Sequence, residues 1–187
     1  LKSSRAPVAE TGQAMKSVKK DALTTHIGVC NYSSSLLHDL MNYCETKPEI
    51  LQIESHPYLT QEKLIRLAKS YGLEVTAFSP LGSISYEEIG GAKENESLLI
   101  NQTIKSVSKD FEISPAQLIL SWALSRGTSI VVKSSSKTRM KENLDASDIE
   151  LDQATIDKIS SLNTNKRYND PGVFCEVAFN TFFPIYE

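Results

Sequence analysis

Short runs of continuously apolar residues alternate along the chain with segments whose apolar positions recur at helical spacing. The apolar runs lack polar alternation, which is typical of strands that helices cover on both faces. Strands are expected at residues 25–30, 50–54, 73–78 and 129–132. A regular alternation of strand and helix predicts an α/β fold with a parallel sheet of four strands and covering helices.

The helical segments carry apolar stripes and local start signals. Val8, Met15 and Val18 are the expected inward residues of the first helix, and Ser114 followed by Pro115 marks the start of a later one. Helices are expected at about residues 7–20, 61–71, 96–111, 114–126, 138–146 and 152–162, with another around residues 36–41 that Ser33 or Ser34 can cap. An aromatic-rich tail follows the last helix.

Polar or otherwise distinctive side chains stand where the strands end. In parallel α/β folds the loops after the carboxyl ends of the strands carry the site. No glycine-rich GxGxxG motif follows any expected strand, so the pattern gives no support to a dinucleotide crevice of the Rossmann kind. Both an open doubly wound sheet and a closed barrel fit this pattern.

Residues 131–143 combine cations, hydroxyl groups and the start of a helix. The apolar run ends in Lys133, three serines follow, and a polar helix then carries Arg139 and Asn143 one turn apart on the same face. Two fixed cations beside unpaired helix N–H groups form an anion site, most naturally for phosphate. The alternative is a solvated cationic face.

Three further strand-end residues suit a flat ring that bears an amide. Asn31 and Gln52 can hydrogen-bond a carboxamide, and Phe78 can stack on the ring. Taken singly, Asn31 also fits a turn, Gln52 a buried amide bonded to backbone, and Phe78 the core. Together with a phosphate site after the fourth strand, they describe a nicotinamide dinucleotide.

Composition narrows the class of partner. The 187-residue chain has a formal net charge of −3, which argues against nucleic acid as the main partner. No apolar run approaches the ~20 residues that span a bilayer. Cys30, Cys44 and Cys175 lack CxxC spacing, which indicates reduced thiols in a cytoplasmic protein rather than disulfides or a metal site.

Several of these segments together resemble the C-terminal half of the aldo-keto reductases. The similar segments, in the family's order and with compatible spacing, are residues 27–32 (IGVCNY), 52–59 (QIESHPYL), 76–83 (TAFSPLGS), 114–117 (SPAQ) and 133–143 (KSSSKTRMKEN). The resemblance covers nearly the whole chain. It implies the C-terminal half of a (β/α)8 TIM barrel that binds NADP(H) across its C-terminal mouth.

The resemblance also implies a role for each matching residue. The residues carried over to the cofactor are Cys30, Asn31 and Gln52 on the nicotinamide carboxamide, Phe78 stacked on the nicotinamide, Ser79, Leu81 and Ser83 along the pyrophosphate, Lys133, Ser134 and Arg139 on the adenosine 2′-phosphate, and Glu142 and Asn143 on the adenine. Phe78 replaces the family's usual Tyr, Cys30 its usual Ser, and Val132 its usual Pro. A thiol is a weaker hydrogen-bond partner than a hydroxyl.

None of the family's catalytic tetrad maps onto this chain. The Asp, Tyr, Lys and His that carry out hydride transfer lie in the first half of the family's barrel, whereas this chain begins at the helix before the fifth strand. We therefore expect residues 1–187 to form a reductase domain that is incomplete on its N-terminal side. Such a chain has two open sheet edges and should be inactive without the missing half.

The tail indicates the class of substrate. Residues 163–171 (NTNKRYNDP) resemble a segment of sugar-reducing members of the family, xylose reductases among them. In those enzymes the position of Asn169 would bind a sugar hydroxyl. The tail's aromatic residues fit a substrate pocket and fit equally an anchor onto the barrel.

The sequence as a whole predicts NADPH-dependent reduction of an aldehyde or aldose to an alcohol by the intact enzyme, with a small carbonyl compound as the substrate. One alternative is a reductase-like module that binds NADP(H) without efficient chemistry. Another is a barrel enzyme of a different class that uses Lys133 and Arg139 to hold a phosphosugar.

Overall fold

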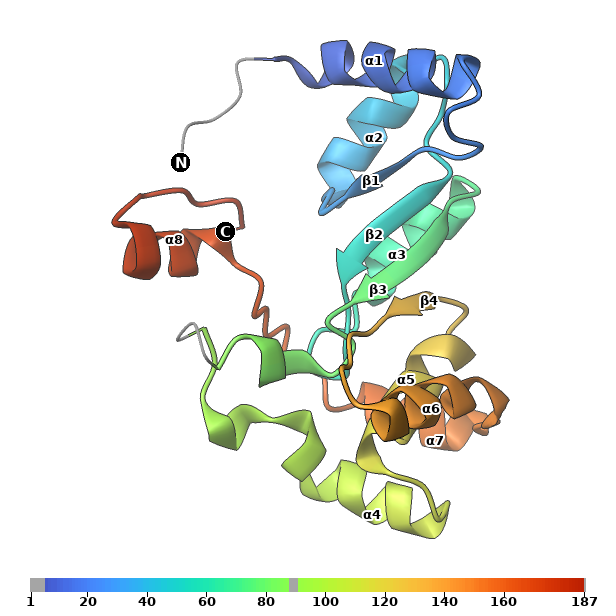
Figure 1. Ribbon diagram of the computed structural model, residues 1–187, viewed down its shortest axis with the longest axis vertical. Coiled ribbons are helices and arrows are strands. Elements are labelled where there is room, and N and C mark those ends of the chain that lie inside the picture. The colour runs from blue at the N-terminus through green and yellow to red at the C-terminus, as the bar shows by residue number, and fades with distance from the viewer. Residues whose placement is uncertain (1–5, 88–90, 187) are drawn as a thin grey trace. The chain divides into compact units, whose positions relative to one another are not determined.

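The computed structural model describes residues 6–87 and 91–186 (Figure 1). The first five residues of the expected irregular lead lie outside this range. The chain divides into two compact units, one of Leu1–Ile53 with Glu62–Thr76 and the other of Glu54–Gln61 with Ala77–Glu187.

The strands of the described residues belong to one sheet in the order β1-β2-β3-β4, which is also their order along the chain. Their bounds are Gly28–Cys30 for β1, Ile50–Glu54 for β2, Glu74–Phe78 for β3 and Ser129–Val131 for β4. A doubly wound sheet reverses its strand order at a switch point, and these strands show no reversal. Two architectures, an open doubly wound sheet and a closed barrel, fitted the sequence pattern. The observed strand order favours the barrel.

The first unit packs helices α2 (Ser34–Tyr43) and α3 (Glu62–Ser70) against strands β2 and β3. Its core consists of aliphatic side chains together with Met41, namely Leu37, Met41, Leu51, Ile53, Leu64, Ile65, Ala68, Leu73 and Val75. Ser33 caps α2 as predicted, since its Oγ accepts a hydrogen bond from the backbone N–H of Leu36. Burial of this apolar surface stabilises the unit.

Helix α1 (Val8–Lys20) forms where the sequence predicted it but buries none of its residues. Val8 is 50% exposed and Met15 is 38% exposed, so the prediction that they face a core is wrong. They line a cavity of the first unit instead.

Strand β1 is shorter and more exposed than the sequence predicted. It covers only Gly28–Cys30, and Gly28 and Cys30 are exposed, whereas residues 25–30 were expected to be buried on both faces. Strand β1 pairs in parallel with β2, with Gly28 opposite Ile50 and Cys30 opposite Gln52. Because β1 is the last strand in the sheet order of the described residues, nothing in that order covers its outer edge.

The second unit is built around helix α5 (Pro115–Ser125), which is buried along most of its length. Trp122 is fully buried, and its Nε1–H donates a hydrogen bond to Ser160 Oγ at 3.0 Å. Helices α4 (Gln102–Asp110) and α7 (Gln153–Ser160) contribute Ile104, Val107 and Ile159 to the same core. The remaining helices of this unit are α6 (Lys137–Asp145) and α8 (Pro171–Phe179), with short 3-10 turns at Gly82–Ser85, Glu94–Glu96, Leu98–Ile100 and Ala146–Asp148.

Two helices of this unit differ from the sequence prediction. The helix expected from residue 96 begins only at Gln102, because Asn101 Oδ1 caps the backbone N–H groups of Thr103 and Ile104. Helix α8 lies in the tail, where no helix was predicted. Its start signal is present in the sequence, since Asp170 caps it and Pro171 occupies its first position.

The pairing of β1 with β2 predicts opposite effects for the same substitution at two glycines. A Cβ added at Gly28 would lie 2.7 Å from the carbonyl oxygen of Ile50, whereas a Cβ at Gly12 in α1 meets nothing within 4 Å. We expect Gly28→Ala to destabilise the full-length protein by about 1–3 kcal/mol and Gly12→Ala to stabilise it by up to about 1 kcal/mol. Denaturant unfolding of both variants checks this, and a stabilising Gly28→Ala would contradict the pairing.

Candidate functional site

A pocket of about 340 Å³ lies in the second unit, beyond the carboxyl ends of β3 and β4. Eight of the residues assigned to the cofactor from the sequence line this one pocket, namely Phe78, Ser79, Leu81, Lys133, Ser134, Arg139, Glu142 and Asn143. They come from two segments about fifty residues apart in the chain. The fold therefore brings together the stacking ring, the loop after β3 and the cationic segment after β4.

Serine hydroxyl groups at the start of α6 fix the backbone on the cationic side of the pocket. Ser136 caps this helix, with its Oγ accepting from the backbone N–H of Arg139 at 3.4 Å, and Ser134 Oγ accepts from the N–H of Ser136 at 3.2 Å. Lys133 and Arg139 are both exposed at the pocket. Among the described residues neither forms an ion pair, so both charges face solvent and are available to an anion.

The opposite side of the pocket is the loop that follows β3. Ser79 and Gly82 adopt left-handed backbone conformations, with φ of 49° and 75°, and these make the tight turn that follows Phe78. The Ser79 Oγ lies 2.8 Å from the phenol oxygen of Tyr86. Ser83, also assigned to the cofactor, is fully buried and donates to Glu87 Oε1 at 3.3 Å, so its side chain is not part of the pocket lining.

The three remaining cofactor candidates lie together in the first unit. Cys30, the last residue of β1, is the register partner of Gln52 in the middle of β2, and the Asn31 backbone N–H donates to the Gln52 carbonyl at 2.9 Å. Asn31 has a left-handed φ of 60°, and its Oδ1 is buried without a hydrogen-bond partner. Desolvation raises the pKa of the Cys30 thiol, which keeps it neutral. An amide donor of a ligand would satisfy the Asn31 oxygen.

Asn169, the predicted substrate residue, is held by a buried carboxylate. Glu54 is fully buried at the end of β2 and accepts from the backbone N–H groups of Tyr168 at 2.8 Å and Asn169 at 3.1 Å. The Glu54 Oε1 also lies 3.0 Å from His56 Nε2, and the Arg167 guanidinium lies 3.6 Å from Oε2. His56 is fully buried, so within the described structure it orients Glu54 rather than reaching a substrate.

Neither Glu54 nor Tyr86 was assigned a role from the sequence. The signal for Glu54 was a charged residue that closes an apolar strand, since a buried charge requires partners. Tyr86 carries no comparable signal, because its partners Ser79 and Tyr168 lie 7 and 82 residues away in the chain.

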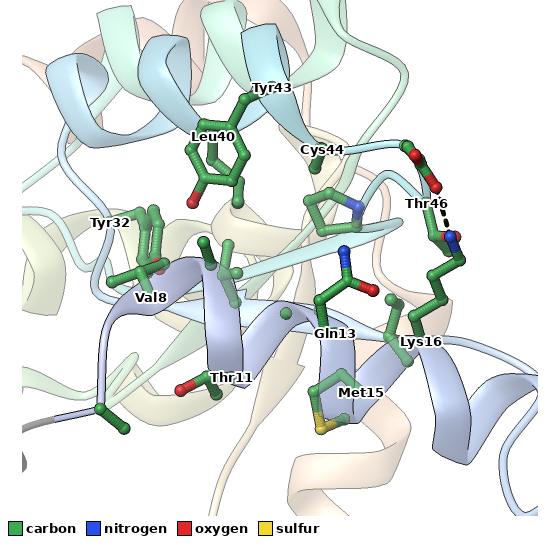
Figure 2. Close-up of a pocket in the computed structure, with 18 residues that line it drawn as sticks. Val8, Thr11, Gln13, Met15, Lys16, Tyr32, Leu40, Tyr43, Cys44 and Thr46 are labelled. Carbon is green, nitrogen blue, oxygen red and sulfur yellow. Dashed lines mark hydrogen bonds and ion pairs between the residues drawn. The ribbon is translucent and has the colours of Figure 1, made fainter.

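A second cavity, of about 230 Å³, lies within the first unit between α1, β1 and α2 (Figure 2). Figure 2 shows Val8, Tyr32, Leu40 and Tyr43 around it, and Lys16 pairs with Glu45 at one end. The lining is largely apolar, and no predicted site residue belongs to it.

Residues 6–87 and 91–186 hold no group of three or more His, Cys, Asp or Glu side chains that could hold a metal ion. Within the same ranges no helix has the length and apolar character needed to cross a membrane.

Among curated proteins, the chain is similar to fungal proteins named as xylose reductases. The chain is 42% identical over 173 residues to the "Probable NAD(P)H-dependent D-xylose reductase xyl1" of Neosartorya fischeri, covering 91% of this chain and 54% of that protein. It is 38% identical over 185 residues to the protein of the same name in Aspergillus flavus, covering 98% of this chain and 56% of that one. The chain thus spans about half the length of the curated relatives it matches.

Solved structures give the same fold. An aldose reductase from Giardia lamblia superposes with a TM-score of 0.82 at 28% identity, covering 98% of this chain and 58% of that one. An aldo-keto reductase from a deep-sea metagenome library superposes with a TM-score of 0.77 at 26% identity, covering 86% of this chain and 56% of the other. The predicted α/β fold, with parallel strands and covering helices consistent with part of a (β/α)8 barrel, is confirmed.

The family assignment follows from the sequence profile as well as from the fold. A family model described as "Aldo/keto reductase family" matches residues 3–164, which is most of the chain. The resemblance predicted from separate short segments is confirmed by this match, by the xylose reductase relatives and by the structural neighbours. The chain belongs to the aldo/keto reductase family.

Proposed function

We propose that the intact enzyme uses NADPH to reduce the carbonyl of an aldehyde or aldose to an alcohol. In this proposal the chain supplies most of the cofactor site and none of the catalytic tetrad. The observation that carries the proposal is the single pocket lined by eight of the residues assigned to the cofactor. Membership of a family of oxidoreductases and relatives named as NAD(P)H-dependent xylose reductases support it.

The preference for NADP(H) over NAD(H) rests on the cations after β4. Lys133 and Arg139 line the pocket without carboxylate partners in the described residues, and Ser134 adds a hydroxyl between them. Arg presents a fork of donors that matches phosphate oxygens, and Lys adds a point charge. These groups suit the 2′-phosphate, which is the part of NADP(H) that NAD(H) lacks.

The residues assigned to the nicotinamide end fit a carboxamide. Asn31 Oδ1 is a buried acceptor without a partner in the described structure, and a carboxamide N–H is the donor it lacks. Gln52, half-buried in the middle of β2, adds a second amide. Phe78, which lines the pocket of the second unit, adds a ring for stacking.

In the proposed reaction the cofactor supplies the reducing hydride and the protein supplies its positioning. NADPH, when bound, supplies the hydride that reduces the carbonyl carbon. The residues of this chain fix the cofactor's position and so contribute proximity and orientation. By the family resemblance, the Tyr that donates the proton to the carbonyl oxygen lies outside this chain.

Asn169 provides the proposed contact to an aldose. Glu54 fixes its backbone through a charge-assisted hydrogen bond. A hydrogen bond to a sugar hydroxyl favours aldoses over aldehydes without hydroxyl groups.

We also propose a cytoplasmic enzyme, on the basis of the free Cys30, Cys44 and Cys175.

A non-catalytic NADP(H)-binding module is the second candidate, because nearly all the site residues proposed in this chain are assigned to the cofactor and none to catalysis. Measuring NADPH oxidation by the full-length protein with D-xylose separates the two. Turnover supports the reductase, whereas tight NADPH binding with no turnover supports the module. Binding of a sugar phosphate but not of NADPH would instead support the phosphosugar enzyme.

The 2′-phosphate assignment predicts a change in cofactor preference. We expect Arg139→Ala in the full-length protein to weaken NADPH binding about 10- to 150-fold, the value of a charge-assisted hydrogen bond. NADH binding should barely change. Fluorescence titration with both cofactors measures the effect, and Lys137→Ala, on the same helix but outside the pocket lining, is the matched control. Equal losses for NADPH and NADH would rule the assignment out.

The carboxamide assignment predicts the opposite pattern, because both cofactors carry the same nicotinamide. We expect Gln52→Leu to weaken NADPH and NADH binding by the same factor, about 3- to 10-fold for one neutral hydrogen bond. The same titrations measure this. A loss confined to NADPH would show that Gln52 does not contact the nicotinamide end.

A further inference from the structure

The position of Asn169 is fixed from two sides within the second unit, and one of the two groups has no assigned role. Glu54 holds the backbone N–H groups of Tyr168 and Asn169 at 2.8 and 3.1 Å. Tyr86, on the loop that follows β3, stacks on Tyr168, the chain neighbour of Asn169. This inference rests on the proposed function, since it concerns how the proposed substrate residue is placed.

Tyr86 is buried in an aromatic stack. Its side chain and that of Tyr168 are 8% and 3% exposed, and their rings stack with centroids 6.1 Å apart and planes 18° apart. Such a stack fixes the direction of both rings. The phenol oxygen of Tyr86 is therefore held at one point rather than sampling solvent.

That oxygen is bonded to one residue of the proposed cofactor pocket, and the Tyr86 ring stacks on Tyr168, the chain neighbour of Asn169. The oxygen lies 2.8 Å from Ser79 Oγ, and Ser79 lines the cofactor pocket. Burial raises the pKa of Tyr86, and hydrogen bonds from Ser79 and from the Asn169 side chain oppose that rise. A neutral phenol has one donor and two acceptor lone pairs, so it can bond both partners at once.

The chain thus has a connected path from the cofactor loop to the substrate residue. Ser79 belongs to the turn after β3, Tyr86 follows it within the same loop, and Asn169 lies next to the ring on which Tyr86 stacks. We propose that Tyr86 is a positioning residue that orients the Asn169 side chain relative to the cofactor loop and thereby raises the enzyme's selectivity for aldoses over aldehydes without hydroxyl groups.

A purely structural role for Tyr86 makes a different prediction, and Tyr168 is the matched control. Tyr168 is equally buried, belongs to the same stack, and its hydroxyl donates to the Glu96 carbonyl at 3.3 Å. Tyr86→Phe and Tyr168→Phe each remove one buried hydroxyl and keep the stacked ring. A role in packing alone predicts similar results for both.

The experiment compares selectivity in the full-length protein. The kcat/KM for D-xylose is divided by that for butanal, which has no hydroxyl group. We expect Tyr86→Phe to lower this ratio about 3- to 10-fold, the effect of one neutral hydrogen bond, and Tyr168→Phe to leave it within about twofold. Fluorescence titration should give an NADPH Kd for Tyr86→Phe within about twofold of the unchanged protein.

A double-mutant cycle with Asn169→Ala tests the path itself. Asn169→Ala should lower the same ratio, and adding Tyr86→Phe to it should cause no further fall. An unchanged ratio in Asn169→Ala, equal effects of Tyr86→Phe and Tyr168→Phe, or a full Tyr86→Phe effect in the Asn169→Ala background would each overturn the inference. Failure of the unsubstituted enzyme to oxidise NADPH with either substrate would instead overturn the proposed function, and the inference with it.

Discussion

Parallel pairing is the constraint on which the rest of this structure depends. Strands that run in the same direction must be joined by a helix that returns the chain to the starting edge, so every carboxyl end emerges on the same side of the sheet. In the second unit this places the loop after β3 beside the segment after β4, and the pocket of Phe78, Lys133 and Arg139 is the result. The helices between the strands supply the core, and the loops are left for function.

Burial of polar groups is the second organising principle. Glu54 is fully buried, yet its two oxygens receive hydrogen bonds from the backbone of Tyr168 and Asn169 and from His56. A buried carboxylate without partners would be strongly destabilising. The hydrogen bonds from Tyr168 and Asn169 therefore stabilise the end of β2 where Glu54 lies. The same requirement for a partner leaves Asn31 Oδ1 as an acceptor that a ligand can satisfy.

Much of this structure could be predicted from local pattern, and the exceptions have physical causes. Strand β2 formed at the predicted residues because its apolar run and its polar ends are both local signals. The exposure of β1 was not predictable, because it depends on which strands surround the sheet edge. The bond between Tyr86 and Ser79 and the ring stack of Tyr86 on Tyr168 were not predictable either, since they join residues that no periodicity relates. Ser83 was assigned from a motif alone, and its buried bond to Glu87 depends on how the loop folds.

The central claim is that the cations after β4 recognise a 2′-phosphate. Isothermal titration of the full-length protein with adenosine 2′,5′-bisphosphate and with adenosine 5′-monophosphate tests it directly, since the two differ only in that group. Charge-assisted hydrogen bonds from Lys133 and Arg139 predict that the bisphosphate binds at least about tenfold more tightly. Equal affinities, or tighter binding of the monophosphate, would contradict the account.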